Sequence, residues 1–371
     1  MLGAVALTLA YLLLWPVPWV PTAWDPPAAD AAFGPGGAGA LDAAQMYGDG
    51  VCEGPEDVVV DGKGRVFVPC RDGQIVRFEP PDFMHHSTVA MTGGAPLGMR
   101  LHPTTGELIV ADIGRGLLAV KPADDGQPET VRVLAEAATG AEGKPFRFTD
   151  ALDFASGGRI VFTDASYKAG ADSVIELLVE RGGTGRVLVW TPRDPEGQPT
   201  GPGAVEVLLR GMHFANGVAI HPDGVSVLVS DTAAYQVFRI PLDGPDKGKP
   251  TPFGPVLPGF PDNLARSEDG KRLWLALPAP RDGLLDALGP WPAMRKVMLR
   301  LPPKLRPKAK PWARAVALDP STGALLHDLS GRGAEGAAGF LTGAVESAGW
   351  LYLGSLRRSR WGRIRLGPDV L

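Results

Sequence analysis

Six times along the chain, an apolar run is followed by a short glycine-containing turn and a second apolar run. The turns lie at residues 61–64, 104–107, 156–158, 222–224, 268–270 and 347–349. The runs that follow them are rich in large or β-branched apolar residues and cover 66–68, 108–110, 160–162, 227–229, 273–275 and 351–353. Turns between such runs are typical of β-hairpins. Repeats about 40–50 residues apart predict propeller blades.

The pattern therefore predicts an all-β fold, a six-bladed β-propeller over residues 46–371. The last strand-like run, 362–366, is expected to close the ring beside the N-terminal strands, because closure removes exposed sheet edges. Two regions break the repeat. Residues 167–181 predict a short helix or a long loop, and a helical insertion is expected near 284–312, with its helix at about 292–300.

Residues at the same phase of every blade meet around the central channel of a propeller. Just before the turns, where the innermost strands begin, oxygen-bearing side chains recur in four blades. They are Glu56, Thr149 with Asp150, Asn216, and Asp262 with Asn263. Blade two offers Leu97 at this phase, and blade six Thr342, whose phase is ambiguous.

Oxygen ligands without sulfur or imidazole suit a hard cation, and Ca²⁺ takes about 6–8 of them. We therefore predict a Ca²⁺ site formed by Glu56, Thr149, Asn216, Asp262 and Asn263. Each residue also has a structural interpretation on its own: Asn216 in a turn, Asp262 and Asn263 as a loop cap, and Glu56 at a solvated strand start. Their shared phase favours the joint site.

The composition sets few limits on function. Hydrophobic residues make up 44% and charged residues 21% of the 371 residues, as in ordinary globular proteins. The formal net charge of −4 gives no reason to expect a nucleic-acid partner.

The N-terminal residues 2–20 are apolar and uncharged, and their length is close to the ~20 residues of a membrane-spanning helix. Residues 1–20 are predicted to be a transmembrane anchor, with a cleaved signal peptide as the alternative. The lack of a basic segment and of a small-residue cleavage site favours the anchor. Because no Lys or Arg lies near it, the propeller is expected on the extracytoplasmic (periplasmic) side. The Ala-, Gly- and Pro-rich residues 21–45 predict a flexible linker.

The only two cysteines, Cys52 and Cys70, flank the first hairpin. An exported location permits a disulfide between them. Simple pairing of the hairpin sets Cys70 opposite Glu56, so that a bridge requires a bend. A disulfide and two separate buried thiols both remain open.

The 295–314 segment is basic and lies near aromatic and methionine side chains. Its charged residues include Lys304, Arg306, Lys308, Lys310 and Arg314, with Trp291, Met294, Met298 and Trp312 close by. This composition favours a solvated loop that caps the channel mouth. The alternative is a surface that contacts anionic lipid.

Six motifs carry a resemblance to a known family. They cover 54–57, 96–98 with 111–117, 148–153 with 162–164, 214–218, 258–263 and 351–356. In these motifs the chain resembles the strictosidine synthase-like proteins, especially relatives of the adipocyte plasma membrane-associated protein, and more distantly the paraoxonases and gluconolactonases. The resemblance implies a six-bladed propeller with an N-terminal membrane anchor. It also implies calcium in the channel, held at positions that match Glu56, Asn216, Asp262 and Asn263.

The chain departs from these relatives at several positions. Thr149 stands where many carry asparagine, and Leu97 stands where paraoxonases carry histidine. The nearest other histidine is His213, which is more simply a packing residue. The last-blade glutamate of strictosidine synthase aligns ambiguously with Thr342 or Glu346.

Together these features predict a calcium-dependent hydrolase acting on a small-molecule ester or lactone. Asp150 or Asp262 is the candidate base for water. No Gly-x-Ser-x-Gly motif indicates an acyl-enzyme. The alternatives are a membrane-tethered binding protein with structural calcium and a condensing enzyme of the strictosidine synthase type.

Overall fold

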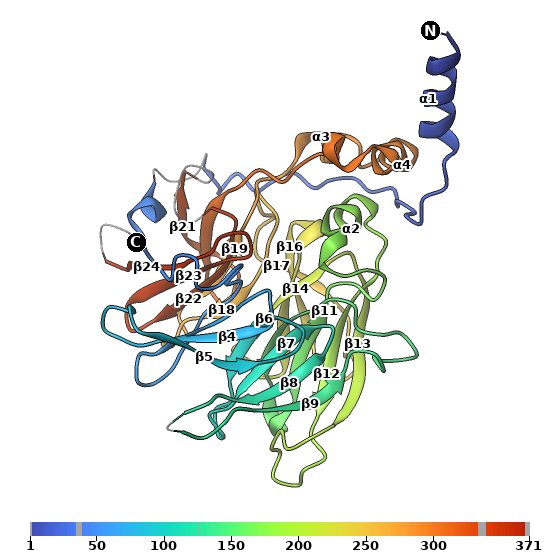
Figure 1. Cartoon of the computed structure of the whole chain (residues 1–371). Helices are drawn as coiled ribbons and strands as arrows, with labels where there is room; N and C mark the ends of the chain where they lie inside the picture. Colours follow the sequence, from blue (N-terminus) through green and yellow to red (C-terminus); the bar gives the residue numbers. More distant parts are fainter. Residues whose placement is uncertain (1, 35–38, 125, 333–338, 368–371) are drawn as a thin grey trace.

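Six four-stranded antiparallel sheets form a six-bladed β-propeller in the computed structural model, which describes residues 2–34, 39–124, 126–332 and 339–367 (Figure 1). The first three blades are β2 (Val59–Val60), β3 (Val66–Pro69), β4 (Gln74–Phe78) and β5 (His86–Met91); β6 (Ala95–Leu101), β7 (Leu108–Ile113), β8 (Gly116–Lys121) and β9 (Thr130–Glu136); and β10 (Thr149–Phe154), β11 (Ile160–Asp164), β12 (Gly185–Thr191) and β13 (Ala204–Met212). The fourth and fifth blades are β14 (Ala215–Ile220), β15 (Ser226–Asp231), β16 (Gln236–Pro241) and β17 (Thr251–Phe253); and β18 (Leu264–Arg266), β19 (Leu273–Leu277), β20 (Ala313–Leu318) and β21 (Leu325–Gly331). The sixth is β22 (Leu341–Ser347), β23 (Trp350–Ser355), β24 (Trp361–Arg365) and β1 (Gln45–Tyr47).

All six predicted turns connect the first and second strands of a blade, which confirms the repeat. The turn between β14 and β15 shows the local interactions that form such a turn. The Asp223 side chain accepts hydrogen bonds from the backbone amides of Val225 (3.0 Å) and Ser226 (2.9 Å). Gly224 takes φ +71°, a conformation that glycine adopts without strain.

The ring closes as predicted, because β24 pairs with the N-terminal strand β1. Tyr47 lies opposite Trp361 in this pairing, and their rings stack with centroids 4.8 Å apart. The two ends of the propeller chain thus share one blade.

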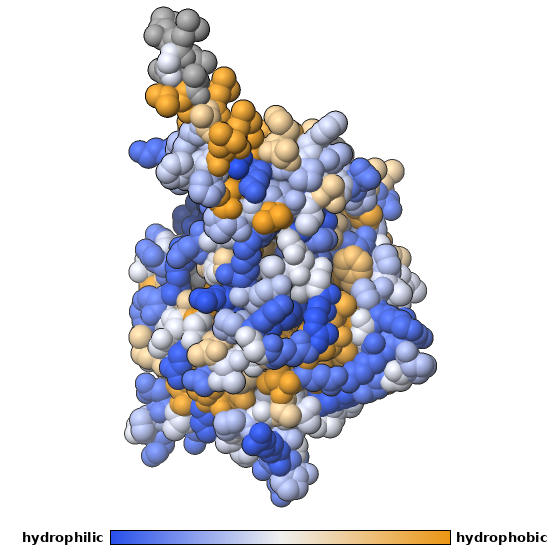
Figure 2. Space-filling view, turned by 90° about the vertical axis from the view of Figure 1, so that its right-hand side faces the viewer, coloured by the Kyte–Doolittle hydropathy of each residue, from blue (hydrophilic) through white to orange (hydrophobic). Residues whose placement is uncertain are grey.

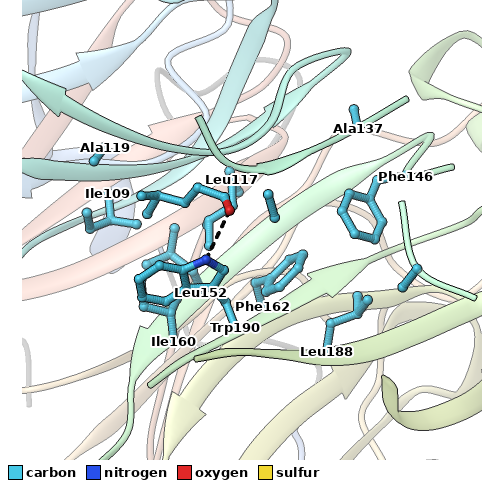
Figure 3. Packing of buried hydrophobic residues seen from close by; sticks show 14 of the residues in the cluster. Ile109, Leu117, Ala119, Ala137, Phe146, Leu152, Ile160, Phe162, Leu188 and Trp190 are labelled. Atoms are coloured by element: carbon cyan, nitrogen blue, oxygen red, sulfur yellow. Dashed lines mark hydrogen bonds between the residues drawn. The ribbon is translucent and has the colours of Figure 1, made fainter. Parts of the chain in front are cut away.

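Apolar side chains pack between neighbouring blades. In the cluster between blades two and three, Leu117 and Leu152 pack with Phe162 and Trp190 (Figure 3). The buried indole of Trp190 donates a 3.0 Å hydrogen bond to the carbonyl of Leu134, so its polar atom is satisfied. This packing holds the inner strands in fixed positions around the channel.

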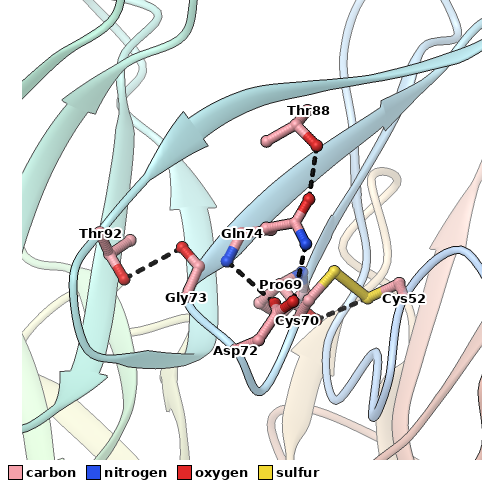
Figure 4. The surroundings of a disulfide bond; sticks show 8 residues. All are labelled: Cys52, Pro69, Cys70, Asp72, Gly73, Gln74, Thr88 and Thr92. Atoms are coloured by element: carbon pink, nitrogen blue, oxygen red, sulfur yellow. Dashed lines mark hydrogen bonds between the residues drawn. A yellow bond between two sulfur atoms is a disulfide. The ribbon is translucent and has the colours of Figure 1, made fainter.

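A disulfide joins Cys52 and Cys70, whose Cα atoms are 5.3 Å apart (Figure 4). The bend that this bridge requires lies at Gly54, which has φ +63°. A Cβ at Gly54 would lie 2.6 Å from the carbonyl oxygen of Leu356, so the close approach needs glycine. Of the two alternatives left open by the sequence, the disulfide is the one observed.

Short helices cover one end of the propeller (Figure 1). They are α2 (Val174–Glu180), preceded by η3 (Ala171–Ser173), and α3 (Gly283–Ala287), α4 (Pro292–Arg300) and η5 (Pro303–Leu305). We call α2, η3 and residues 283–310 the cap. The helix expected near 292–300 and the helical insertion are confirmed, and 167–181 contains a short helix. Three further 3₁₀ helices are η1 (Ala40–Ala43), η2 (Ser156–Gly158) and η4 (Thr232–Ala234).

The N-terminal helix α1 (Leu2–Leu14) leads into an extended segment that runs along the cap. Thr22 donates its amide to the carbonyl of Glu180 (3.1 Å), and Arg295 donates to the carbonyl of Thr22. The guanidinium of Arg181 lies over the ring of Trp24, 3.6 Å from its centroid. Part of the interval predicted as a flexible linker is therefore bound to the cap.

Among the described residues, no helix combines the length and the apolar character needed to cross a bilayer. α1 contains 13 residues. The anchor predicted for residues 1–20 and the periplasmic placement of the propeller stay predictions.

Candidate metal centre

β-Bulges position the candidate site residues at the start of the innermost strands. In β6, β10 and β14 the register shifts so that two residues face one on the neighbouring strand. The first residue of each bulge is Leu97, Asp150 or Asn216, and Thr342 lies at a similar shift in β22. A bulge redirects side chains locally, and all four of these line one cavity.

The other two site residues, Glu56 and Asp262, lie just before β2 and β18, outside regular strand pairing. Gly217 allows the inner strands to come this close, because a Cβ there would lie 2.4 Å from the amide nitrogen of Leu264 and 2.5 Å from the carbonyl oxygen of Asp262. Asn216–Gly217 is thus a close strand contact and not a simple turn.

Hydroxyl groups tie the site backbone of neighbouring blades together. Thr163, opposite the bulge in blade three, donates a 2.7 Å hydrogen bond to the carbonyl of Asn216. Ser230, opposite the bulge in blade four, donates a 2.7 Å bond to the carbonyl of Asp262, and Thr342 donates a 2.8 Å bond to the carbonyl of Glu56. Sequence reasoning missed Thr163 and Ser230. Both could have been found from the sequence, because each is a hydroxyl residue directly before the aspartate that ends the second strand of its blade.

The cavity lies between the inner strands and the cap and has a volume of about 780 Å³, within the usual range for small-molecule sites. Its polar inner end is formed by Glu56, Asp150, Asn216 and Asp262. Its walls are mainly apolar and include Leu97, Ile113, Phe148, Leu178, Phe214, Phe260, Leu285, Met298, Phe340 and Leu356. None of the described lining residues is histidine or cysteine.

Burial, together with repulsion between carboxylates at Glu56 and Asp150, raises the pKa values of three acidic residues at this inner end. The pKa of Glu56 is raised well above its ordinary value by burial first, and then by repulsion from Asp262 and Asp150. The pKa of Asp150 is likewise raised by burial and by Asp262. Burial raises the pKa of Asp262 to about 7. Concentrated negative charge of this kind is what a cation would neutralise.

Unpaired oxygen atoms provide a separate test of whether the residues fit a metal ion. Glu56 Oε1 accepts a hydrogen bond from the Asn263 side chain, but the buried Glu56 Oε2 has no partner among the described residues. The buried Asn216 Oδ1 and Thr149 Oγ1 also lack partners there. Leaving buried oxygens unpaired is costly, and an all-oxygen donor set suits Ca²⁺. The residues therefore fit this ion.

Within the described residues, no three or more His, Cys, Asp or Glu side chains gather as a metal-binding cluster. The carboxylates are thus near enough to repel one another without forming a site by themselves. The amide oxygen of Asn216, which lines the same cavity and has no partner among the described residues, is a further oxygen donor beside them.

The remaining predicted residues occupy different places. Thr149 and Asn263 are buried next to the site but do not line the cavity, whereas Asp150 does. Asp57 is not available as a ligand, because it is buried in a 2.7 Å ion pair with Arg100 and accepts the amide of Met99 (3.1 Å).

The two residues considered for other mechanisms lie outside the cavity. A ring nitrogen of His213 lies 3.1 Å from the carbonyl oxygen of Arg181, and His213 is not part of the lining. Glu346 is bound by Arg272 (2.6 Å) and by the indole of Trp274 (2.7 Å) in a pocket at the other end of the channel. Thr342, in contrast, lines the cavity.

Comparison with known proteins identifies the family. The strictosidine synthase-like 10 protein of Arabidopsis thaliana is 32% identical over 333 residues, which cover 82% of this chain and 83% of that protein. The chain belongs to the strictosidine synthase-like family. The family models "Strictosidine synthase" and "Strictosidine synthase-like, N-terminal" match residues 150–245 and 39–78. The adipocyte plasma membrane-associated protein of Salmo salar is also 32% identical, over 82% of this chain and 73% of its own length.

Solved structures share the fold of this strictosidine synthase-like chain at low sequence identity. A gluconolactonase from Xanthomonas campestris superposes with a TM-score of 0.57 at 16% identity, covering 95% of this chain and 99% of that one. A calcium-binding protein, regucalcin, from Agrobacterium tumefaciens has a TM-score of 0.56 at 13% identity, with 86% and 92% covered. These matches agree with the six-bladed propeller.

Proposed function

We propose that the chain is a calcium-dependent hydrolase of small-molecule esters or lactones. The observation that carries this proposal is the set of buried, unpaired oxygens of Glu56 and Asn216 beside the carboxylates of Asp150 and Asp262, at the inner end of a cavity with mainly apolar walls. Such a cavity can enclose the apolar part of a substrate and bring its polar bond to the oxygen-rich end.

Glu56, Asn216 and Asp262 would hold calcium, with Asn263 orienting the Glu56 carboxylate through its hydrogen bond. When bound, the ion supplies positive charge that polarises a carbonyl group and stabilises an oxyanion. Asp150 and Asp262 both line the cavity and are the candidate groups to accept a proton from water. The cap limits the access of solvent to this end of the channel.

Several observations support hydrolysis over the alternatives. Solved proteins with this fold are described as a gluconolactonase and as a calcium-binding protein. Condensation of the strictosidine synthase type gains no support from Glu346, because this carboxylate is paired at the other end of the channel. A structural calcium without turnover remains the main competing outcome of the test.

The test is a panel of aryl esters and lactones assayed with the full chain in calcium and in excess chelator. Asn216→Ala removes one proposed ligand, and Asp269→Asn, in an exposed turn between β18 and β19, is the matched control. We expect hydrolysis only in calcium, its loss in Asn216→Ala, and normal activity in the control. Full activity in chelator would reject the mechanism, and calcium-dependent stabilisation without any turnover would indicate a structural role.

We also propose an extracytoplasmic location for the propeller. The Cys52–Cys70 disulfide supports this, because such bonds persist in oxidising compartments. Protease added to intact spheroplasts should digest the propeller. Protection until the cells are lysed would contradict this location.

A further inference from the structure

Large apolar side chains exposed to solvent gather at the cap end of the molecule. Among the described residues fifteen such side chains are exposed, and only four lie elsewhere: Met84, Met91, Val225 and Leu326. The other eleven lie on α1, on the segment that follows it or on the cap: Leu7, Leu9, Tyr11, Leu13, Leu14, Trp15, Val20, Leu284, Trp291, Met294 and Leu305. Figure 2 shows hydrophobic surface running from the N-terminal helix onto the adjacent end of the body.

The helices α3 and α4 carry apolar side chains on both faces. Leu285 and Met298 point inward and line the cavity. Leu284, the adjoining Trp291 and Met294 are 55%, 62% and 52% exposed. A helix on the surface of a water-soluble domain normally turns charged or polar residues outward. The outer side of the cap is therefore suited to an apolar neighbour.

α1 is fastened to the cap, and so it extends the same surface. Arg300, at the end of α4, donates to the carbonyls of Trp15 (2.6 Å) and Leu12 (3.1 Å). The hydroxyl of Tyr11 donates in turn to the carbonyl of Arg300 (2.9 Å). The exposed side chains of α1 and those of the cap thus belong to one continuous region. We call this region, α1 with the outer side of α3, α4 and η5, the docking face.

Positive charge borders the docking face. Lys304, Lys308 and Lys310 are exposed and have no ion-pair partner among the described residues. Acidic residues of the cap are largely neutralised: Glu176 by Arg306, Asp286 by Arg281 and Glu180 by Lys168. The exposed carboxylates that remain nearby include Asp25 and Asp172. The local balance is positive, which complements an anionic partner.

We infer that the docking face rests on the surface of an anionic lipid bilayer. The apolar side chains enter the boundary between headgroups and acyl chains, while the lysines contact the anionic headgroups. Exposed tryptophans such as Trp15 and Trp291 are typical of this interface. The combination of aliphatic, tryptophan and lysine side chains favours a lipid surface over a protein partner. Lys308 and Lys310 also line the cavity, so the cavity would open beside the membrane.

Site-directed spin labels test this orientation in the full chain. One nitroxide is placed at Met294→Cys in the docking face. The control label is placed at Val225→Cys, an equally exposed apolar position beside the turn between β14 and β15. Both native cysteines are held in the disulfide and do not react. Each protein is added to vesicles of phosphatidylcholine with phosphatidylglycerol, and collisions with oxygen and with a water-soluble nickel complex are measured.

We expect the label at 294 to lose collisions with the nickel complex and to gain collisions with oxygen, while the label at 225 changes little. Charge reversal of Lys304, Lys308 and Lys310 to glutamate should reduce this protection. If the protein sediments with the vesicles while the label at 294 stays accessible to nickel, α1 alone holds the chain and the inference is wrong. A label at 294 that is immobilised without lipid, in a concentration-dependent way, would instead assign the face to a second copy of the chain.

Discussion

Replacing Asp262 with asparagine should stabilise the protein in chelator, and this advantage over the parent should largely disappear in calcium. In the metal-free protein, burial is the main factor that raises the pKa of Asp262 from 3.8 to about 7, whereas the Asn216 side chain and the Asn263 amide act to lower it. Because the folded-state pKa lies above the unfolded one, the stability that depends on this proton is complete below about pH 4. It is lost as the pH rises through 7.

The magnitude follows from the size of the shift. About 3 pKa units correspond to about 4 kcal/mol at pH 8. This value is an upper limit, because part of Asp262 faces the cavity. For 371 residues, an unfolding entropy of about 2.1 cal/mol/K per residue gives roughly 0.8 kcal/mol/K. Asp262→Asn should therefore raise Tm by at most about 5 °C in chelator. In calcium the parent gains about 4 kcal/mol at 1,000 times Kd, and the variant should lose most of that gain.

The assay is differential scanning calorimetry at pH 8, in chelator and in calcium. Asp269→Asn serves as the control, because it also removes one carboxylate but lies outside the cavity lining. Its effect on Tm should be the same in both conditions. An Asp262→Asn shift of Tm of the same size in both conditions would refute the reasoning, since it would separate the buried charge at the site from calcium binding.

Three further predictions concern other parts of the fold. Burial raises the pKa of Asp112 to about 6, so the stability tied to its proton is complete below pH 4 and lost as the pH rises through 6. Relative to the parent, Asp112→Asn should gain up to about 2 kcal/mol between pH 4.5 and 7.5 in urea unfolding, and an equal difference at both pH values would contradict this. Replacing Cys52 and Cys70 by serine opens a loop of 18 residues and should cost about 3 kcal/mol in the same assay; unchanged stability would be the opposing result. Thr342→Val removes the hydrogen bond to the carbonyl of Glu56. It should lower the free energy of unfolding by about 1–3 kcal/mol and weaken calcium binding in titration calorimetry. Thr342→Ser keeps the hydroxyl group and should therefore keep the stability and the calcium affinity of the parent.

The blades could be predicted from the sequence because their signals are local. A turn such as 222–224 contains its own hydrogen-bonding aspartate and a glycine with positive φ. The apolar runs on either side have strand length, and the repeat orders them. The helix at Pro292–Arg300 was also predictable, because proline suits its first turn and apolar residues recur at helical spacing.

The common phase of Glu56, Asn216 and Asp262 could likewise be read from the sequence, and all three line one cavity. The sequence did not show which of Thr149 and Asp150 faces the cavity. This depends on the bulge in β10, where Asp150 lines the cavity and Thr149 does not. A bulge is set by contacts with the neighbouring strand and blade, which a single sequence does not reveal.

Features that depend on distant contacts were also out of reach. The cross-blade hydrogen bonds of Thr163 and Ser230 join residues 53 and 32 positions apart. The disulfide accompanies a chain path through Gly54, where a positive φ and the nearby carbonyl of Leu356 both require glycine. The binding of residues near Thr22 to the cap likewise had no signal, because an Ala- and Pro-rich composition is equally typical of a free linker.

Metal analysis of the purified full chain after dialysis against micromolar calcium tests the proposed centre most directly. One calcium ion per chain is expected in the parent protein and in Asp269→Asn, and none in Asn216→Ala. A parent protein without calcium, or an Asn216→Ala variant that retains the full amount, would show that these oxygens do not form the site.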